Sequence, residues 1–389
     1  MKGYVLKNHL TCMLIIVLGF ALIMPSPAGA ASPKRELWSC YDVGSSGYIQ
    51  ASSIADAMLK KYGMRVRLTP AGTAISRLIP LINKRVDFGF LASEVYCAVE
   101  GLYEFSTIEW GPQDLRVVLA APASHAMAVS EVSGLKKIED AIGKRWATFP
   151  SSSDKIKLLA YLAYLNVTEK DVEMIEFPGY SASTGALKDG NADLAGMPPT
   201  AGHAYEMEAH PKGLHFLEFD PNNAEGIARM QQVAPMMSIG YETVGAGLSK
   251  DKGVWLGVYR YPMLTVRADM DADTVYEIIK RMDETYPLYK DAYPPNKRWD
   301  INESGVPPVD APFHEGAIRY LKEKGIWKPE HDVWNNKRIA HLKNVKVLWQ
   351  EFLDSIDQMD EKAKNNLKGD KFSKAWLDYR KKGLEKLGE

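Results

Sequence analysis

A serine-rich turn near the start of the chain is the first candidate for chemistry. Ser45, Ser46 and Tyr48 lie in or just after the turn 44–47, where an expected strand is followed by an expected helix. Free backbone N–H groups at the beginning of a helix favour a bound anion. A plain glycine-rich turn with helix caps explains the same residues equally well, so both interpretations stay open at this point.

Arg77 is the second candidate, because a guanidinium group can bind a carboxylate through two parallel hydrogen bonds. Thr73 stands where a helix cap belongs, and Arg77 follows it about one helical turn later. Positions four apart lie on the same face of a helix, so Arg77 would look toward the end at which strands and helices meet. The alternative is an arginine on the solvated face of its helix.

Signals for metal binding or catalysis are weak. His203, Glu206 and His210 share one helix face at i, i+3 and i+7, where a metal could bind. Such a trio is more often a solvated polar face. The segment 179–183 departs from the G-x-S-x-G nucleophile elbow, and no paired acid and base stands out. We therefore expect no enzyme activity, no metal site and no cofactor.

The composition limits the class of protein. Of 389 residues, 46% are hydrophobic and 25% are charged, which excludes disordered and polytopic membrane proteins. The length suits two domains, because single cores stop growing at roughly 250–300 residues. The 48 lysines and arginines are balanced by 49 acids, so no basic excess is left for binding nucleic acid.

Residues 1–30 have the features of a secretory signal. Two lysines precede the uncharged apolar run 10–24, and alanines at positions 28 and 30 match a signal-peptidase site. The run is shorter than the roughly 20 residues that span a bilayer, which disfavours the alternative of a single anchoring helix. We expect an exported, soluble periplasmic protein.

Two cysteines, Cys40 and Cys97, would remain after cleavage of the signal. Neither has the spacing of a C-x-x-C motif or of a metal-ligand set. An oxidising compartment would permit a disulfide between them. Two isolated buried thiols are the simpler interpretation.

Strands and helices alternate along two stretches with similar endings, which predicts two α/β lobes. An ending of the form Asp-apolar-Gly follows a helix at Asp87 and again at Asp193, about one lobe apart. Such alternation implies parallel sheets with helices on both faces. The expected strands are 37–43, 64–69, 86–91, 145–149, 172–177 and 192–196.

Four further apolar segments should carry the chain between the lobes. Segments 115–121 and 126–129 would lead out, and 254–258 and 262–266 would return, so that paired strands form a hinge. The expected domains are lobe 1 (31–123 and 255–327), lobe 2 (124–254) and a helical C-terminal extension (328–389). Apolar stripes in the extension would pack onto lobe 1, or alternatively serve a partner or a dimer.

Four segments in order carry a family resemblance: 72–95, 134–147, 186–193 and 314–325. VDFGFLASEV at 86–95 is similar to the pattern ADLALVQSDV, and ALKDGNAD at 186–193 is similar to ALKDGQIDA. In this order the segments resemble the TAXI family of TRAP-transporter solute receptors, which are two-lobed type II periplasmic binding proteins. The resemblance spans about residues 37–327 and leaves out the extension.

The resemblance implies an extracytoplasmic receptor that binds a small organic acid or amino acid between its lobes. It also implies delivery of that solute to TRAP-type membrane subunits. Two alternatives stay open. One is a periplasmic ligand sensor that acts through a partner protein by means of the C-terminal extension, and the other is a periplasmic metal-binding protein.

The resemblance places ligand contacts in the first glycine-rich turn, the turn before Ser93, the serine turn of lobe 2, and near Tyr180 and Pro198. With the candidates above, the expected ligand-binding residues are Ser45, Ser46, Tyr48, Thr73, Arg77, Ser93, Glu94, Ser152, Ser153, Asp154, Tyr180 and Pro198. Ser93 could also cap the helix that follows it.

The chain departs from the family pattern at positions that bear on the ligand. Asp154 ends the segment SSSD, where the family has GSGT, so an acid lies near a helix N-terminus. This acid would cap the helix and repel a carboxylate. Glu94 stands in ASE where the family has QSD, and Arg77 replaces an asparagine. Acids near one end and an arginine near the other would suit a zwitterion better than a dicarboxylate.

Overall fold

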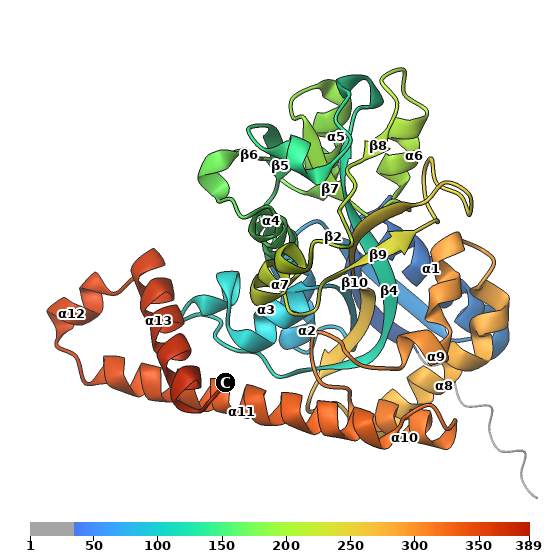
Figure 1. The fold of residues 1–389 in the computed structure, drawn as a ribbon. Helices are drawn as coiled ribbons and strands as arrows, with labels where there is room; N and C mark the ends of the chain where they lie inside the picture. The colour runs from blue at the N-terminus through green and yellow to red at the C-terminus, as the bar shows by residue number, and fades with distance from the viewer. Residues whose placement is uncertain (1–34) are drawn as a thin grey trace, which may run out of the picture.

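The computed structural model describes residues 35–389. The predicted signal segment, residues 1–30, lies outside the described residues. The strands join into one sheet in the order β2-β1-β3-β10-β4-β7-β5-β6, with β8 paired to β4 and β9 paired to β10. Helices surround this sheet, and a long helical arm extends from one side of the molecule (Figure 1). The predicted α/β class, with paired crossing strands and a helical C-terminal extension, is confirmed.

We call the part built on β1–β3 lobe 1. Its three strands are parallel, and a helix follows each of them. Thr73 caps α2 as predicted, because its side chain accepts a hydrogen bond from the Ser76 amide and Ser76 bonds back. The elements are β1 (Arg35–Tyr41), α1 (Ser46–Tyr62), β2 (Arg65–Ala71), α2 (Ala74–Ile82), β3 (Phe88–Leu91), α3 (Glu94–Glu100), α8 (Ala272–Tyr289), α9 (Ile301–Ser304) and α10 (Glu315–Glu323).

We call the part built on β5–β7 lobe 2. β5 pairs in parallel with both β6 and β7, so the same alternation of strand and helix recurs. Its elements are β5 (Arg145–Thr148), α4 (Ser152–Leu165), β6 (Glu173–Glu176), α5 (Tyr180–Asp189), β7 (Leu194–Met197), α6 (Gly202–Glu208), β8 (His215–Phe216), α7 (Ala224–Val233) and β9 (Ser238–Glu242). The exact lobe boundaries stay a prediction.

Two long strands, β4 (Leu115–Val129) and β10 (Val254–Arg267), connect the lobes. The expectation of four separate segments is wrong, because each pair of segments forms one continuous strand. β4 and β10 pair with each other along their shared length, with a register shift between Arg260 and Met263. β4 continues beyond that length and pairs with β7, while the other edge of β10 pairs with β9 at one end and with β3 at the other. The two lobes therefore share one hydrogen-bonded ladder (Figure 1).

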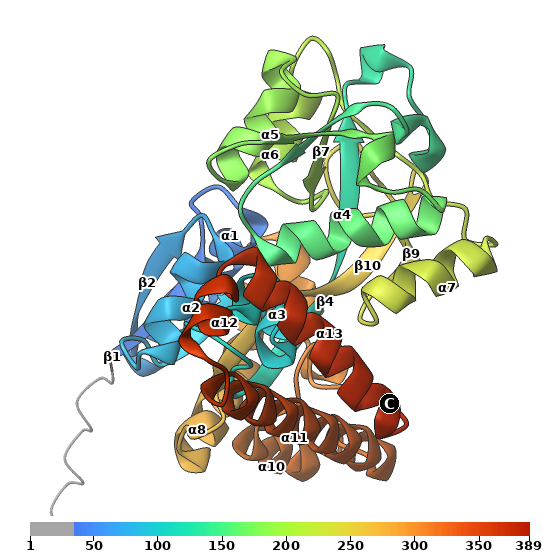
Figure 2. The same cartoon turned by 90° about the vertical axis from the view of Figure 1, so that its left-hand side faces the viewer.

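The C-terminal extension consists of α11 (Pro329–Asp357), α12 (Glu361–Asn366) and α13 (Asp370–Lys386). α11 and α13 lie side by side next to lobe 1 (Figure 2). Trp376 is fully buried, and its indole N–H donates to the Gly101 carbonyl at 2.7 Å. Gly111 has φ +61°, and a Cβ there would lie 2.5 Å from the Trp349 ring. The predicted packing of the extension onto lobe 1 is confirmed.

A buried charge cluster fastens the extension to the end of α3. The Glu100 carboxylate, 1% exposed, forms ion pairs with Arg338, Arg380 and His341. Arg338 and Arg380 are each 16% exposed. Burial raises the pKa of Glu100, but its bond to His341 and the two guanidinium groups outweigh burial and hold that pKa well below its usual range. Glu100 therefore stays ionised.

Cys40 and Cys97 are both buried and both free. Burial raises the pKa of each thiol, so neither forms a reactive thiolate readily. The interpretation as isolated buried thiols is confirmed. Within residues 35–389, no helix combines the length and the apolar character needed to cross a membrane.

Replacing Glu100 with alanine should detach the extension from α3. Removing one partner of a buried ion cluster leaves uncompensated cations and typically costs about 3–5 kcal/mol. Urea unfolding should show a loss of this order. As a control, Glu361→Ala removes a glutamate that is 86% exposed and should change stability by less than about 0.5 kcal/mol. Equal stability of the two variants would contradict the role given to Glu100.

Candidate functional site

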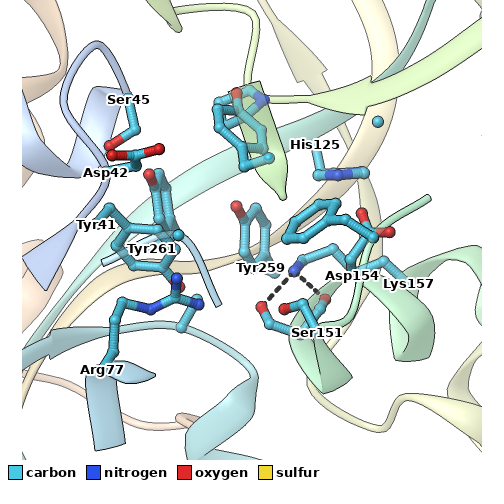
Figure 3. A pocket seen from close by; sticks show the side chains of 17 residues that line it. Tyr41, Asp42, Ser45, Arg77, His125, Ser151, Asp154, Lys157, Tyr259 and Tyr261 are labelled. Atoms are coloured by element: carbon cyan, nitrogen blue, oxygen red, sulfur yellow. Dashed lines mark hydrogen bonds between the residues drawn. The ribbon is translucent and has the colours of Figure 1, made fainter. Parts of the chain in front are cut away.

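A small cavity lies where the two lobes meet above the hinge strands (Figure 3). Its volume is about 50 Å³. The carboxyl ends of β1 and β5 and the beginnings of α1 and α4 converge on it, as is usual for ligand sites in α/β proteins. The residues that line it are Tyr41, Asp42, Ser45, Gly72, Arg77, Ala92, His125, Phe149, Ser151, Ser153, Asp154, Lys157, Tyr180, Gly196, Pro198, Tyr259 and Tyr261.

The hinge supplies the floor of the cavity. Tyr259 and Tyr261 lie two residues apart on β10 and therefore on one face of the strand; their rings stack with centroids 5.7 Å apart. His125 comes from the paired position on β4, opposite Gly257. Burial, with Lys157 nearby, holds the pKa of His125 well below its usual range, so the ring is neutral and bonds to the Tyr161 hydroxyl at 3.0 Å.

Lys157, which is 4% exposed, brings a positive charge to the lobe 2 side of the cavity. Its Nζ donates to the Ser153 carbonyl and, at 2.8 Å, to Ser153 Oγ, and it lies 4.7 Å from the centre of the Tyr259 ring. Burial lowers the pKa of Lys157, while Asp154 and Glu94 partly oppose this effect. Within the described chain no carboxylate forms a direct ion pair with Lys157. This ammonium group is therefore available to an anion.

Arg77 also lines the cavity, but its charge is already balanced. The side chain is 2% exposed, and its Nε lies 3.0 Å from Glu94 Oε1. The guanidinium group stacks over Tyr41 at 4.0 Å, and the Tyr41 hydroxyl donates to both Glu94 oxygens at 2.9 Å. Burial alone would raise the pKa of Glu94, but Arg77 and the hydrogen bonds outweigh burial and hold that pKa below its usual value. The alternative of a solvated helix arginine is wrong.

Asp154 does not cap α4, contrary to the prediction. Ser151 occupies the cap position, and the Asp154 side chain instead points into the cavity (Figure 3). Its Oδ2 accepts a hydrogen bond from Thr148 at 3.0 Å. Burial raises the pKa of Asp154 to about 7. The carboxyl group is therefore partly protonated near neutral pH and repels an anion less than expected.

The first glycine-rich turn serves the fold as well as the cavity. Ser45 caps α1 by accepting from the Tyr48 amide at 3.2 Å, and the Gly47 amide donates to the Tyr261 hydroxyl at 2.9 Å. A Cβ on Gly47 would lie 2.8 Å from that hydroxyl oxygen, so this close approach requires glycine. The expectation of free N–H groups is therefore wrong for Gly47 and Tyr48.

Six of the twelve predicted ligand-binding residues line the cavity, and six do not. Ser46 bonds across the lobe boundary, Tyr48 lies behind the turn, Thr73 caps α2, and Glu94 lies behind Arg77. Ser93 precedes α3 without a side-chain capping bond, so the prediction that its side chain caps this helix is wrong. Ser152 lines a neighbouring cavity. The six that line the central cavity are Ser45, Arg77, Ser153, Asp154, Tyr180 and Pro198.

Sequence reasoning missed Lys157 and the groups from the hinge. The expected helix 156–165 is apolar apart from Lys157, and this single charge is the signal that could have identified the residue. The alternation of Tyr259 and Tyr261 in an expected strand was a weaker signal. Asp42 was missed because it lies at the end of β1, one residue outside the element, where strand and turn are hard to separate.

The lobes touch directly around the cavity. Ser46 Oγ lies 3.1 Å from Thr200 Oγ1, and the Gly202 amide donates to the Gly44 carbonyl at 3.3 Å. On another side of the boundary, the Ser152 amide of lobe 2 donates to Glu104 Oε1 of lobe 1 at 2.8 Å. This arrangement is a closed one, in which a bound solute would be enclosed.

The predicted helix-face trio does not form a metal site. His203 Nδ1 lies 3.6 Å from Glu206 Oε2, while the His210 ring accepts from the Lys212 amide. Across residues 35–389, no group of three or more His, Cys, Asp or Glu side chains is arranged to hold a metal ion.

A family model described as NMT1-like family matches residues 43–325. The chain belongs to the NMT1-like family. The match runs from the end of β1 to just after α10 and contains all cavity residues except Tyr41 and Asp42. The C-terminal extension of this NMT1-like protein lies outside the match. A search of curated proteins found no match.

Solved structures show distant likenesses to this NMT1-like chain. The alkanesulfonate-binding protein SsuA from Xanthomonas axonopodis pv. citri, bound to MOPS, is 15% identical, with 76% of this chain and 92% of that chain covered and a TM-score of 0.42. An ancestral arginine-binding protein bound to arginine is 14% identical, with 68% and 97% covered and a TM-score of 0.40. The Escherichia coli aliphatic sulphonate binding protein SsuA is 14% identical, with 79% and 89% covered and a TM-score of 0.41. No function follows from likenesses this distant.

Arg77→Met should destabilise the protein even without a solute. The change leaves Glu94 buried and unpaired, which typically costs about 3–5 kcal/mol. The double variant Arg77→Met with Glu94→Gln removes both charges and should recover most of this loss. Urea unfolding of the parent, the two single variants and the double variant gives the coupling energy. A coupling below about 0.5 kcal/mol would contradict the pairing.

Asp154→Asn should stabilise the protein more at high pH than at low pH. The pKa of Asp154 is raised on folding, so the folded state holds the proton longer, and stability falls as pH rises from about 4 to 7. Asparagine cannot ionise, so the advantage of the variant should grow by roughly 2–3 kcal/mol between pH 5 and pH 8. Denaturant unfolding at both pH values measures it. A constant difference would mean that Asp154 titrates normally.

Proposed function

We propose that this protein is an extracytoplasmic solute receptor that binds a small organic acid or amino acid between its lobes. The observation that carries the proposal is Lys157, a buried ammonium group that has no ion-pair partner among residues 35–389 and lies at a cavity to which both lobes contribute. A buried charge is costly unless it is paired. A carboxylate that enters the cavity would supply the missing partner.

The opposite side of the cavity favours an amino acid over a simple acid. Asp42 lies there beside Ser45, and its Oδ2 accepts from Ser181 Oγ at 3.3 Å (Figure 3). An amino acid could place its carboxylate at Lys157 and its ammonium group at Asp42. The Tyr180 hydroxyl oxygen is buried without a partner in the described structure, so it could bond to the solute.

The arrangement favours binding over catalysis. His125 is neutral and already bonded to Tyr161. Ser153 Oγ accepts a hydrogen bond from Lys157 Nζ, whereas a nucleophilic hydroxyl donates its proton to the base that activates it. The contacts between the lobes instead fit a receptor that closes around a solute and is stabilised by it.

Delivery to a TRAP-type transporter is the finer part of the proposal. It is supported by the four sequence segments that resemble TAXI receptors and by the export signal expected in residues 1–30. The test is solute uptake by TRAP membrane subunits reconstituted in vesicles, with and without the purified protein. Mass spectrometry of ligand released from gently purified protein would name the solute.

One observation favours the alternative of a ligand sensor. The seven-residue helix α3 begins with Glu94, which pairs with Arg77 at the cavity, and ends with Glu100, which holds the extension. A shift of α3 on solute binding would therefore reach the extension. Isolation of a partner protein that binds only the solute-loaded form would favour sensing over transport.

Lys157→Met should weaken acid binding strongly without unfolding the protein. A thermal-shift screen of amino acids, keto acids and aromatic acids should first identify a stabilising solute. Loss of a buried charge partner costs about 2–5 kcal/mol in binding, so affinity should fall about 30-fold or more. Because methionine removes a buried charge and keeps the length, the empty variant should be at least as stable as the parent.

The matched control is Lys170→Met, which removes an exposed lysine of lobe 2. Titration calorimetry should give this control an affinity within about twofold of the parent. If Lys157→Met also binds within about threefold of the parent, the anion is held elsewhere.

A further inference from the structure

A second and larger cavity lies beside the first, at the outer edge of the lobe boundary. Its volume is about 400 Å³, within the range of ligand pockets. It is formed mainly by lobe 2, along α4, which crosses the front of the molecule in Figure 2. Lobe 1 contributes Tyr103 and Glu104. Phe149 and Ser151 line both cavities and form the wall between them.

Three buried oxygen atoms of residues that line this second cavity have no hydrogen-bond partner in the described structure. They are Ser151 Oγ, Ser152 Oγ and Glu104 Oε2. Ser151 is 5% exposed and Ser152 is 1% exposed. Buried polar atoms are nearly always bonded to protein or to ordered water, so these three atoms are available to accept hydrogen bonds from a bound molecule.

The charges around the cavity specify the sign of that molecule. Three glutamates line it, Glu104, Glu169 and Glu176, against the single cation Lys155. Lys155 pairs with Glu169 at 3.0 Å, which leaves two carboxylates to attract a cation. Glu104 Oε1 already accepts from the Ser152 amide, so Oε2 is its free acceptor.

The remaining walls are apolar or aromatic. Tyr103 and Phe149 supply rings, and Leu158, Leu159 and Met174 supply aliphatic surface. An ammonium group is attracted both by carboxylates and by the faces of aromatic rings. An apolar body is stabilised by burial against the aliphatic side chains. An organic cation has both features, whereas an inorganic cation lacks the apolar body.

We infer that this cavity binds a primary amine with an apolar or aromatic body, with its ammonium group at Glu104 and the Ser151 and Ser152 hydroxyls. This site is separate from the proposed acid site and does not depend on it. Because the Glu104–Ser152 bond joins the two lobes at the cavity, an amine bound there would favour the closed arrangement.

Tyramine is the probe for this inference, with 2-(4-hydroxyphenyl)ethanol as the matched neutral analogue. Tyramine should raise the melting temperature of the purified protein and give saturable heats in titration calorimetry. The neutral analogue should bind at least tenfold more weakly. Glu104→Gln keeps the side-chain shape and should weaken tyramine about tenfold or more, while Glu361→Gln on α12 should leave its affinity unchanged.

Two further variants cover a Glu104 variant that does not fold and tyramine that binds in the central cavity. If Glu104→Gln does not fold, Glu176→Gln, at an exposed position of the same cavity, should weaken tyramine severalfold. Asp42→Asn should leave tyramine binding unchanged, because Asp42 belongs to the central cavity. The inference is overturned if the parent does not bind tyramine at millimolar concentration or if the neutral analogue binds equally well. It is also overturned if the folded Glu104 or Glu176 variant keeps the parent affinity.

Discussion

β4 and β10 pair with each other from Leu115 and Arg267 at one end to His125 and Gly257 at the other. This ladder holds the lobes together, because each strand continues into the sheet of both lobes. It also forms the floor of the central cavity through His125, Tyr259 and Tyr261. Strands so fully bonded resist sliding, so movement between the lobes has to come from bending or twisting of this pair. Any opening of the cavity would then occur at its rim and leave this floor in place.

The charged side chains of the central cavity lie at its rim, and they differ in how their charges are balanced. Arg77 is paired with Glu94 and serves the stability of lobe 1, whereas within residues 35–389 the hydrogen bonds of Lys157 in lobe 2 go to a carbonyl and a hydroxyl. Burial keeps Asp154 partly protonated beside it, which limits both the attraction within lobe 2 and the repulsion of an incoming anion. The net effect is a cavity whose available positive charge belongs to one lobe, so a bound acid would connect Lys157 to groups of the other lobe.

The fold could be predicted from the sequence because it depends on local patterns. Alternating apolar residues and the Thr73 cap are signals within a few positions of one another, and the structure confirms them. The pairing of Arg77 with Glu94 spans 17 positions and two helices, so spacing gave no sign of it. Asp154 was predicted to cap its helix because composition alone cannot show which way a side chain turns. Lys157 was missed because a single lysine in an apolar helix usually lies at the surface.

Helix α3 connects the central cavity to the C-terminal extension, which lies outside the family match. Glu94 at its start and Glu100 at its end are both buried carboxylates paired with arginines, one at the cavity and one in the extension. A helix of seven residues has about two turns, so a displacement at one end would carry over to the other. The Gly101 carbonyl, just beyond α3, receives the Trp376 indole, which fixes that end in place. Any rearrangement of Arg77 during solute binding must therefore either be absorbed in the side chains around Glu94 or shift the extension with α3.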